Sequence, residues 1–168
     1  MDFLTLARER FSVLEYEHRE VEPEKLNAIL DAALAAPTAC NNQPQRIVVI
    51  DTEEKRAKLQ AAAPSRYFAP AAFLVCCDKR ECWVRPMDGR SSGEIDASIA
   101  ATHMMLEAAD LGLGSIWVMY WDAQRMKEAF ALEEHIEPVA LLIVGYKAEG
   151  AKPRPGHFAS KTREDILL

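Results

Sequence analysis

The segment from Glu94 to Leu111 constrains the fold most, because it has helical spacing and is apolar almost all round. One face of the expected helix carries a stripe made of Ile95, Ile99, Thr102, Leu106 and Ala109. The remaining surface carries small or apolar residues, namely Ala97, Ala100, Ala101, Met104, Met105 and Ala108. A helix of this kind must be covered on all sides. A chain of 168 residues offers little more than one core, so we expect one side of the helix to pack against another subunit.

The other periodic segments predict helices alternating with short strands within a single domain, residues 1–168. Helices are expected at residues 2–9, 22–36, 52–63 and 122–132, and strands at residues 46–51, 71–78, 114–121 and 138–147. Pro23 marks a helix start, because proline is favoured at the first helical position, and Pro37 marks the end of that helix. Residues 80–93 are rich in polar residues, glycine and proline and are expected to form a loop.

Charge and hydropathy exclude several classes of protein. The net charge is −6, from 20 basic and 26 acidic residues, whereas binding to nucleic acid or to an anionic membrane needs clustered positive charge. No apolar run reaches the length of about 18 residues that a membrane span requires. The N-terminus lacks the apolar core of a signal peptide. We therefore expect a cytoplasmic protein with no nucleic-acid and no membrane partner.

The four cysteines lack the spacing of a zinc site or a disulfide framework; they are Cys40, Cys76, Cys77 and Cys82. Two of them, Cys76 and Cys77, lie inside an apolar run and are interpreted as small buried hydrophobic residues. Cys40 lies in a polar loop, where a reactive thiol is an open alternative. A reducing compartment agrees with this use of cysteine.

Other chemical motifs give little support to catalysis by protein side chains. Gly112 and Gly114 follow a helix and precede a strand, which is the reverse of a dinucleotide-binding fingerprint, so Gly112 is interpreted as a helix C-cap. No histidine has the H-E-x-x-H spacing, and neither a hydrolase elbow nor a phosphate loop is present. We expect no metal site and no catalytic side chain. In an enzyme of this kind, a cofactor carries the difficult step.

A polar loop, "APTACNNQPQ" at residues 36–45, suits such a cofactor. Groups that can bond to the edge of a flat heteroaromatic ring are offered by Thr38, Asn41, Asn42 and Gln43. Cations and hydroxyl groups that suit a phosphate are present near both ends of the chain, at Arg8, Arg10, Ser12, Ser160, Lys161 and Arg163. Taken alone, each segment also fits an ordinary solvated loop.

In combination, these motifs resemble the FMN-dependent nitroreductase family, and in particular its short members. The resemblance rests on the order of "R-x-S-V", "AAPTACNNQPQR", "DASIAATHMMLEAADLGLGSIWV", "PVALLIVGY" and a closing "H-x-x-S-K-T". It implies an α+β fold with a mostly antiparallel central sheet flanked by helices. It also implies an intertwined homodimer with two FMN sites at the subunit interface.

The resemblance further implies roles for individual residues. Those expected to bind FMN are Arg10, Ser12, Leu14, Pro37, Thr38, Asn41, Gln43, Trp117, Val118 and Lys161. The loop residues are expected to reach the flavin ring from the partner subunit, and Arg10 and Lys161 to hold the phosphate. Leu14 and Ser160 stand where the family usually has cations. Candidates for the substrate side, with a place in the core as the alternative, are Phe68, Trp83, Tyr120 and Trp121.

The function that this resemblance implies is a transfer of hydride from NADH or NADPH through FMN to an electron-poor small molecule, such as a nitroaromatic compound or a quinone. An alternative from another class is a flavin-binding or FMN-free dimer without reductase turnover, which would act as a sensor, a sequestering protein or a structural homologue. A specialised reaction, such as dehalogenation or flavin destruction, is a third possibility.

Overall fold

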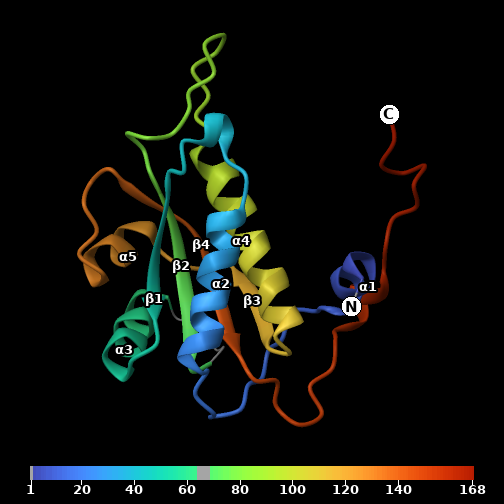
Figure 1. Cartoon of the computed structure of the whole chain (residues 1–168). Coiled ribbons are helices and arrows are strands. Elements are labelled where there is room, and N and C mark those ends of the chain that lie inside the picture. The colour runs from blue at the N-terminus through green and yellow to red at the C-terminus, as the bar shows by residue number, and fades with distance from the viewer. Residues whose placement is uncertain (1, 64–68) are drawn as a thin grey trace.

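A four-stranded antiparallel sheet forms the centre of the protein (Figure 1). The computed structural model describes residues 2–63 and 69–168. The strands follow one another across the sheet in the order β1 (Gln45–Ile50), β2 (Ala71–Asp78), β4 (Ile136–Gly145) and β3 (Gly114–Val118). The predicted α+β fold with a mostly antiparallel sheet is confirmed. The strand predicted at 114–121 is too long, because the chain leaves the sheet after Val118.

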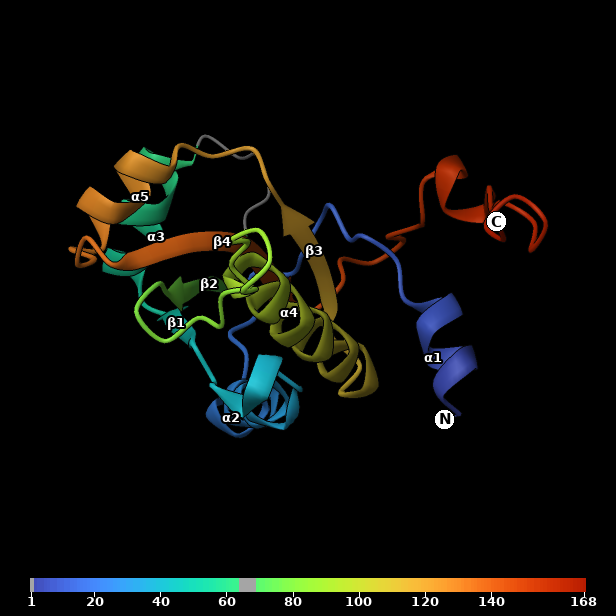
Figure 2. The ribbon, with the colours of Figure 1, turned by 90° about the horizontal axis from the view of Figure 1, so that it is seen from above.

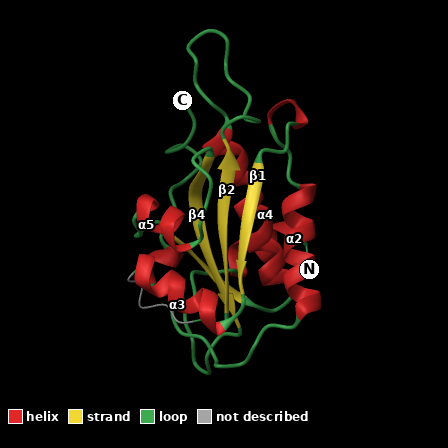
Figure 3. Cartoon of the chain, turned by 90° about the vertical axis from the view of Figure 1, so that its left-hand side faces the viewer, coloured by secondary structure: helices red, strands yellow, loops and turns green. Residues whose placement is uncertain are grey.

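Helices cover both faces of this sheet (Figure 3). One face is covered by α2 (Pro23–Ala35) and α4 (Gly93–Asp110), and the other by α3 (Glu53–Ala62) and α5 (Ala123–Ala129). Side chains of β2 alternate between the two cores, so that Phe73 and Cys77 pack under α2 and α4, and Leu74 and Cys76 pack on the other side. Every residue of β2 is buried, which explains its continuous apolar sequence.

The register of the strands places the end of β2 against the loop that precedes β1. β2 pairs with β1 from Ala72–Ile50 to Cys77–Gln45, and the backbone N–H of Asp78 donates to the carbonyl of Pro44 at 2.8 Å. The polar loop at 36–45 and the turn after β2 therefore lie at the same end of the sheet, where β1 begins and β2 stops.

Local signals in the sequence set the helix ends as expected. The side chain of Thr52 accepts a hydrogen bond from the N–H of Lys55, and Asp122 accepts one from Arg125, so both residues cap their helices. Gly112 has a φ of +79° and ends α4 in the left-handed conformation that glycine adopts without steric cost. The interpretation of "LGLGS" as a helix end is thereby confirmed.

The two sides of α4 differ in their surroundings. Its small residues, with Met104, are buried against the sheet and α2. The opposite, apolar stripe lies at the surface. Ile95 is 48% exposed, and a shallow hollow is lined by residues that include Ile99 and His103. This apolar face lacks a cover among the residues that the structure describes. Although α4 has 18 residues, no described helix is long and apolar enough to cross a membrane.

Both ends of the chain extend away from the sheet on the same side of the molecule (Figure 2). α1 (Phe3–Glu9) buries none of its residues, and η2 (Pro155–Phe158) lies beside it. The ring of His157 bonds through Nε2 to the carbonyl of Arg8 at 3.1 Å and contacts the Phe11 ring edge to face. Residues 2–12 and 147–168 are called the terminal arm below. Its exposed apolar side chains include Phe3, Leu4, Phe158 and Ile166.

Candidate functional site

The polar segment at residues 36–45, called the amide loop below, has an unusual backbone. It contains the short helix η1 (Ala39–Asn41). Cys40, Asn41 and Gln43 have φ values of 52°, 54° and 52°, in the left-handed region that non-glycine residues rarely adopt. Such conformations cost about 1–3 kcal/mol each and persist where the surroundings hold them, often at binding sites. The side chains of Asn41 and Gln43 are exposed.

The carboxylate of Asp96, one turn into α4, fixes one end of the amide loop. Its Oδ1 accepts from the N–H of Ala39 at 2.9 Å, and its Oδ2 accepts from the Ser92 hydroxyl at 2.7 Å. Asp96 is only 2% exposed, so both bonds lie away from water. Within the loop, the hydroxyl of Thr38 accepts from the N–H of Gln43 at 3.0 Å. The loop is therefore clamped to the first turn of α4.

The turn after β2 fixes the other end of the loop. The amide Nδ2 of Asn42 donates to the carbonyl of Glu81 at 3.0 Å. Arg46 donates to the carbonyl of Gln43 at 3.1 Å and forms a close ion pair with the Glu81 carboxylate. These contacts leave the Asn41 and Gln43 side chains exposed, where they can face a ligand. The Asn42 side chain instead ties the loop to the turn after β2.

A second group of predicted residues lies at the opposite end of α4. Arg10 ends α1 and lines a hollow with Ala109, Asp110 and Gly112. Ser12 bridges to Ser115 at the start of β3, beside a bond from the N–H of Val13 to the Ser115 carbonyl. Arg10 and Ser12 therefore lie between the end of α1 and the start of β3, beside the last turn of α4.

Lys147 is a cation of this hollow that sequence reasoning missed. It follows β4 and lines the hollow together with Arg10. A Cβ added at Gly114 would lie 2.8 Å from Lys147 Cγ, so the glycine leaves room for the lysine stem. The ammonium lies 6.0 Å from the centre of the Phe11 ring. The sequence gave no signal for this role, because an exposed lysine after a strand is common in any protein.

The basic side chains of the terminal arm lack acidic partners among the described residues. In the described part of the chain, its Lys and Arg side chains form no ion pair; they are Arg8, Arg10, Lys147, Lys152, Arg154, Lys161 and Arg163. Lys161 is exposed and follows His157 by four residues, near the contact with α1. An arm with unpaired cations can neutralise an anionic group such as a phosphate.

The two halves of the predicted site lie at opposite ends of α4 in one chain (Figure 1). The amide loop joins the first turn through Asp96, and the hollow with Arg10 lies beside the last turn. Because α4 has 18 residues, these ends are about 27 Å apart. One chain therefore separates the ring-binding groups from the phosphate-binding groups by a helix length.

The other predicted residues occupy varied places. Leu14 and Trp121 pack against the core under α3 and α5, in which Val118 is buried. The indole N–H of Trp121 donates to the Val118 carbonyl at 3.0 Å. Trp117 packs on the α4 side, and Tyr120 is 77% exposed.

Three further residues complete the prediction. Pro37 is exposed just after α2, and Trp83 is half-buried in the loop before α4. Phe68 lies outside the described residues. Among the aromatic candidates that the structure describes, Tyr120 is the most exposed, and Trp121 lies against the core.

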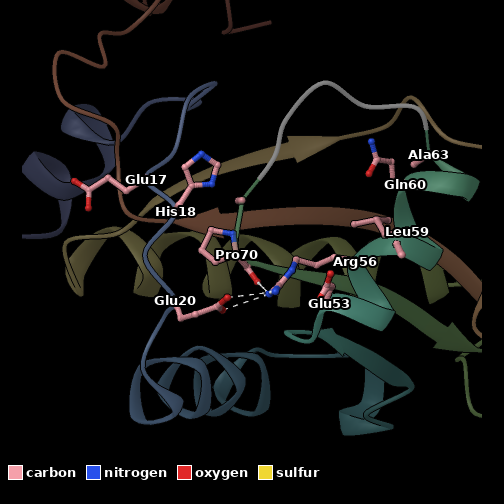
Figure 4. Close-up of a pocket in the computed structure, with 11 residues that line it drawn as sticks. Glu17, His18, Glu20, Glu53, Arg56, Leu59, Gln60, Ala63 and Pro70 are labelled. Carbon is pink, nitrogen blue, oxygen red and sulfur yellow. Dashed lines mark hydrogen bonds and ion pairs between the residues drawn. The ribbon is translucent and has the colours of Figure 1, made fainter.

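Another hollow, of about 440 Å³, lies at the far side of the sheet between α3 and residues 17–20 (Figure 4). Its arginine is engaged with neighbouring groups. Arg56 pairs with Glu20 at 3.2 Å and donates to the carbonyls of Asp51 and Pro70 at 3.0 and 2.6 Å. Among the predicted site residues that the structure describes, none lines it.

The donor set of the two halves fits FMN. The terminal arm supplies unpaired cations and the Ser12 hydroxyl for a phosphate and a ribityl chain. The amide loop supplies the exposed amides of Asn41 and Gln43 on a backbone held in left-handed conformations. The residues present therefore match the chemistry of a flavin nucleotide at both of its ends.

Comparisons with known proteins support this interpretation. Residues 7–75 and 66–146 match the sequence model of the nitroreductase family. A Methanothermobacter thermautotrophicus protein, provisionally named as an NADH dehydrogenase/NAD(P)H nitroreductase, is 31% identical over 92% of this chain and 82% of its own length.

Two solved structures extend the comparison. A nitroreductase family protein from Clostridium difficile 630 is 42% identical, with a TM-score of 0.94, over 100% of this chain and 98% of that chain. An FMN-dependent nitroreductase from Clostridium difficile R20291 is 27% identical, with a TM-score of 0.76, over 95% and 98% of the two chains.

Proposed function

This chain belongs to the nitroreductase family, and from that premise we propose that it passes hydride from NAD(P)H through FMN to an electron-poor acceptor, such as a nitroaromatic compound or a quinone. An oxidoreductase that uses FMN and NAD(P)H follows from the family and from the names of its relatives. The proposal extends this activity to a class of acceptor and to the residues that hold the cofactor.

The observation that carries the proposal is the division of the site between the two ends of α4. A homodimer solves this division, because two copies of α4 packed antiparallel across a two-fold axis bring the amide loop of one subunit to the terminal arm of the other. The same packing covers the apolar stripe around Ile95 and Ile99, which one chain leaves at the surface. A face of this kind commonly marks an interface.

In the proposed site, Arg10, Lys147 and Lys161 hold the phosphate of FMN, and Ser12 bonds to the chain beside it. Charge-assisted hydrogen bonds of this kind are roughly twice as strong as neutral ones. FMN, when bound, supplies the capacity to accept and donate hydride, which protein side chains lack.

The amide loop has a different task, which is to orient the flavin ring. Asn41 and Gln43 bond to its polar edge, and the clamp at Asp96 keeps both residues in position. The loop's small residues let the ring lie close to the backbone. Tyr120, exposed after β3, is placed to line the acceptor side. The protein therefore positions the reactants, and no side chain has to transfer a proton.

Flavin spectroscopy combined with rapid kinetics tests the proposal. The purified protein is expected to be yellow, and mixing with NADH or NADPH in a stopped-flow instrument is expected to bleach the flavin band. Addition of a nitroaromatic compound or a quinone should restore the band over repeated cycles. A protein that binds no FMN, or one whose bound flavin neither nicotinamide reduces, would contradict the proposal and favour a dimer without turnover.

A further inference from the structure

Two cysteine thiols meet beneath the amide loop. A Cβ added at Gly93, the first residue of α4, would lie 2.6 Å from Cys82 Sγ and 2.9 Å from Cys77 Sγ, so both sulfur atoms lie within 2.9 Å of one point. The turn between them is closed by a hydrogen bond from the N–H of Glu81 to the carbonyl of Asp78 at 3.1 Å. Both cysteines are free thiols. Only a glycine at position 93 leaves room for the two sulfurs.

The same turn supports the amide loop. Asn42 donates to the Glu81 carbonyl at 3.0 Å, and Arg46 pairs with the Glu81 carboxylate. The first turn of α4, which begins at Gly93, also supports the loop, because Asp96 Oδ1 accepts from the N–H of Ala39 at 2.9 Å. A change in the position of Cys82 is therefore transmitted directly to Glu81, its neighbour in the chain, and from there to Asn42.

We propose that Cys77 and Cys82 form a redox pair that hydrogen peroxide oxidises to a disulfide, and that this bond moves the turn on which the amide loop rests. To bond with Cys77, the Cys82 sulfur must leave the carbonyl of Asp78, to which it now donates at 3.2 Å. The disulfide thus replaces the hydrogen bond from Cys82 to the Asp78 carbonyl with a covalent bond from Cys82 to Cys77.

The chemistry begins at Cys82, which is the more accessible of the two thiols. Its sulfur attacks one oxygen of the peroxide; an S–O bond forms, the O–O bond breaks, and a sulfenic acid and water result. The Cys77 sulfur then attacks the Cys82 sulfur; the S–S bond forms, the S–O bond breaks, and the departing hydroxide takes the Cys77 proton as water. Two thiols lose two electrons, and one peroxide becomes two waters.

The surroundings of Cys77 suit the resolving role. Burial, followed by the neighbouring Cys82 thiol, raises the pKa of Cys77 to about 12. A thiol of this kind is a poor target for peroxide by itself, because the thiolate is the reactive form. It needs a sulfenic acid beside it, and Cys82 supplies one. Cys76 points to the opposite face of the sheet, within the core under α3 and α5, and cannot take part.

Peptide mapping tests the bond itself without any flavin. Trypsin cuts after Lys79 and Arg80, between the two cysteines, so the disulfide joins residues 67–79 to residues 81–90. After peroxide treatment and alkylation of free thiols, the wild type is expected to give this linked pair, and dithiothreitol is expected to separate it. Cys76→Ala is the matched control, since Cys76 is equally buried on the other face, and it should still give the link.

The variants separate the steps. Cys82→Ala, at a half-buried position, should give no link and leave Cys77 unoxidised. Cys77→Ala should accumulate a sulfenic acid at Cys82 that dimedone traps. Unlinked peptides in the oxidised wild type would overturn the proposal. So would a link that survives in Cys77→Ala and disappears in Cys76→Ala.

The effect on the loop rests on the proposed function and is measured separately. Loss of one neutral hydrogen bond, from Asn42 to Glu81, is expected to weaken FMN binding about fivefold to tenfold in the oxidised wild type. Cys82→Ala should bind FMN equally with and without peroxide. A disulfide that forms without changing FMN affinity would refute the coupling to the loop. Failure of the reduced protein to bind FMN would instead count against the proposed function.

Discussion

At the scale of single residues, the cation that most needs testing is Lys147, since it shares the hollow with Arg10 while Leu14 packs into the core. Lys147→Met keeps the apolar stem and removes the charge. Charge-assisted hydrogen bonds contribute about 1.5–3 kcal/mol, so FMN affinity should fall roughly tenfold to a hundredfold. The measurement is a titration followed by flavin fluorescence.

The matched control for this experiment is Lys152→Met, which makes the same charge change in the terminal arm outside the hollow. It should alter FMN affinity little. Equal losses in both variants would mean that the arm acts through its overall charge, and that Lys147 has no contact with the phosphate.

Glu22 offers a residue-scale test of pH dependence. Tyr146 Oη donates to Glu22 Oε2 at 2.5 Å, and Arg19 pairs with Oε1 at 2.6 Å. The Tyr146 bond is the largest cause that lowers the pKa of Glu22 from 4.5 to about 2. Since the folded pKa lies below the unfolded one, this stabilisation is present above pH 4.5 and is lost as the pH falls toward 2.

Tyr146→Phe should therefore raise the pKa of Glu22 toward its ordinary value and reduce the loss of stability over that acid range. The measurement is an NMR titration of the Glu22 carboxyl group, with Arg19→Met as a variant that removes a smaller cause. A Glu22 titration that is unchanged in Tyr146→Phe would refute the assigned role of the hydroxyl.

At the scale of elements, the first turn of α4 and the amide loop form one unit through Asp96. Asp96→Ala leaves the N–H of Ala39 and the hydroxyl of Ser92 without their partner, which should lower the free energy of unfolding by about 1–3 kcal/mol. Asp96→Asn can still accept from Ala39 and donate to Ser92, so it should restore most of that loss. Chemical unfolding of the three proteins checks the order. Equal stability of Asp96→Ala and the wild type would show that the clamp does not hold the loop.

The elements themselves were largely readable from the sequence. Periodicity and boundary residues such as Pro23 and Pro37 located helices and strands, because these depend on local interactions. The amide loop could be identified by its small and amide residues. The clamp at Asp96 could not be identified from the sequence, because Asp96 is one acid among several on a helix. The contact between Asp96 and Ala39 depends on tertiary packing. For the same reason, the meeting of Cys77 and Cys82 at Gly93 has no sequence signal.

For the molecule as a whole, the proposed FMN site requires two subunits. The apolar stripe of α4 and the extended terminal arm are both surfaces that a partner would cover. Sequence reasoning predicted the first from the all-round apolar helix. The distance between the amide loop and Arg10 became visible only with the fold, because it depends on which end of α4 each segment contacts.

Subunit complementation tests whether two subunits share each FMN site. One variant, Arg10→Ala with Lys147→Met, loses the phosphate half of the site. The other, Asn41→Asp with Gln43→Glu, keeps the loop's shape but replaces its amide donors with carboxylates. Each homodimer alone should bind FMN weakly. Co-expression with two different affinity tags, followed by tandem purification, isolates the dimer that contains one subunit of each kind.

In that heterodimer, one site combines both altered halves and the other combines both intact halves. FMN titration by fluorescence should therefore show one site per dimer with wild-type affinity. A heterodimer that binds FMN no better than the two altered homodimers, or a failure to isolate any dimer, would mean that the amide loop and Arg10 do not serve the same cofactor across the interface.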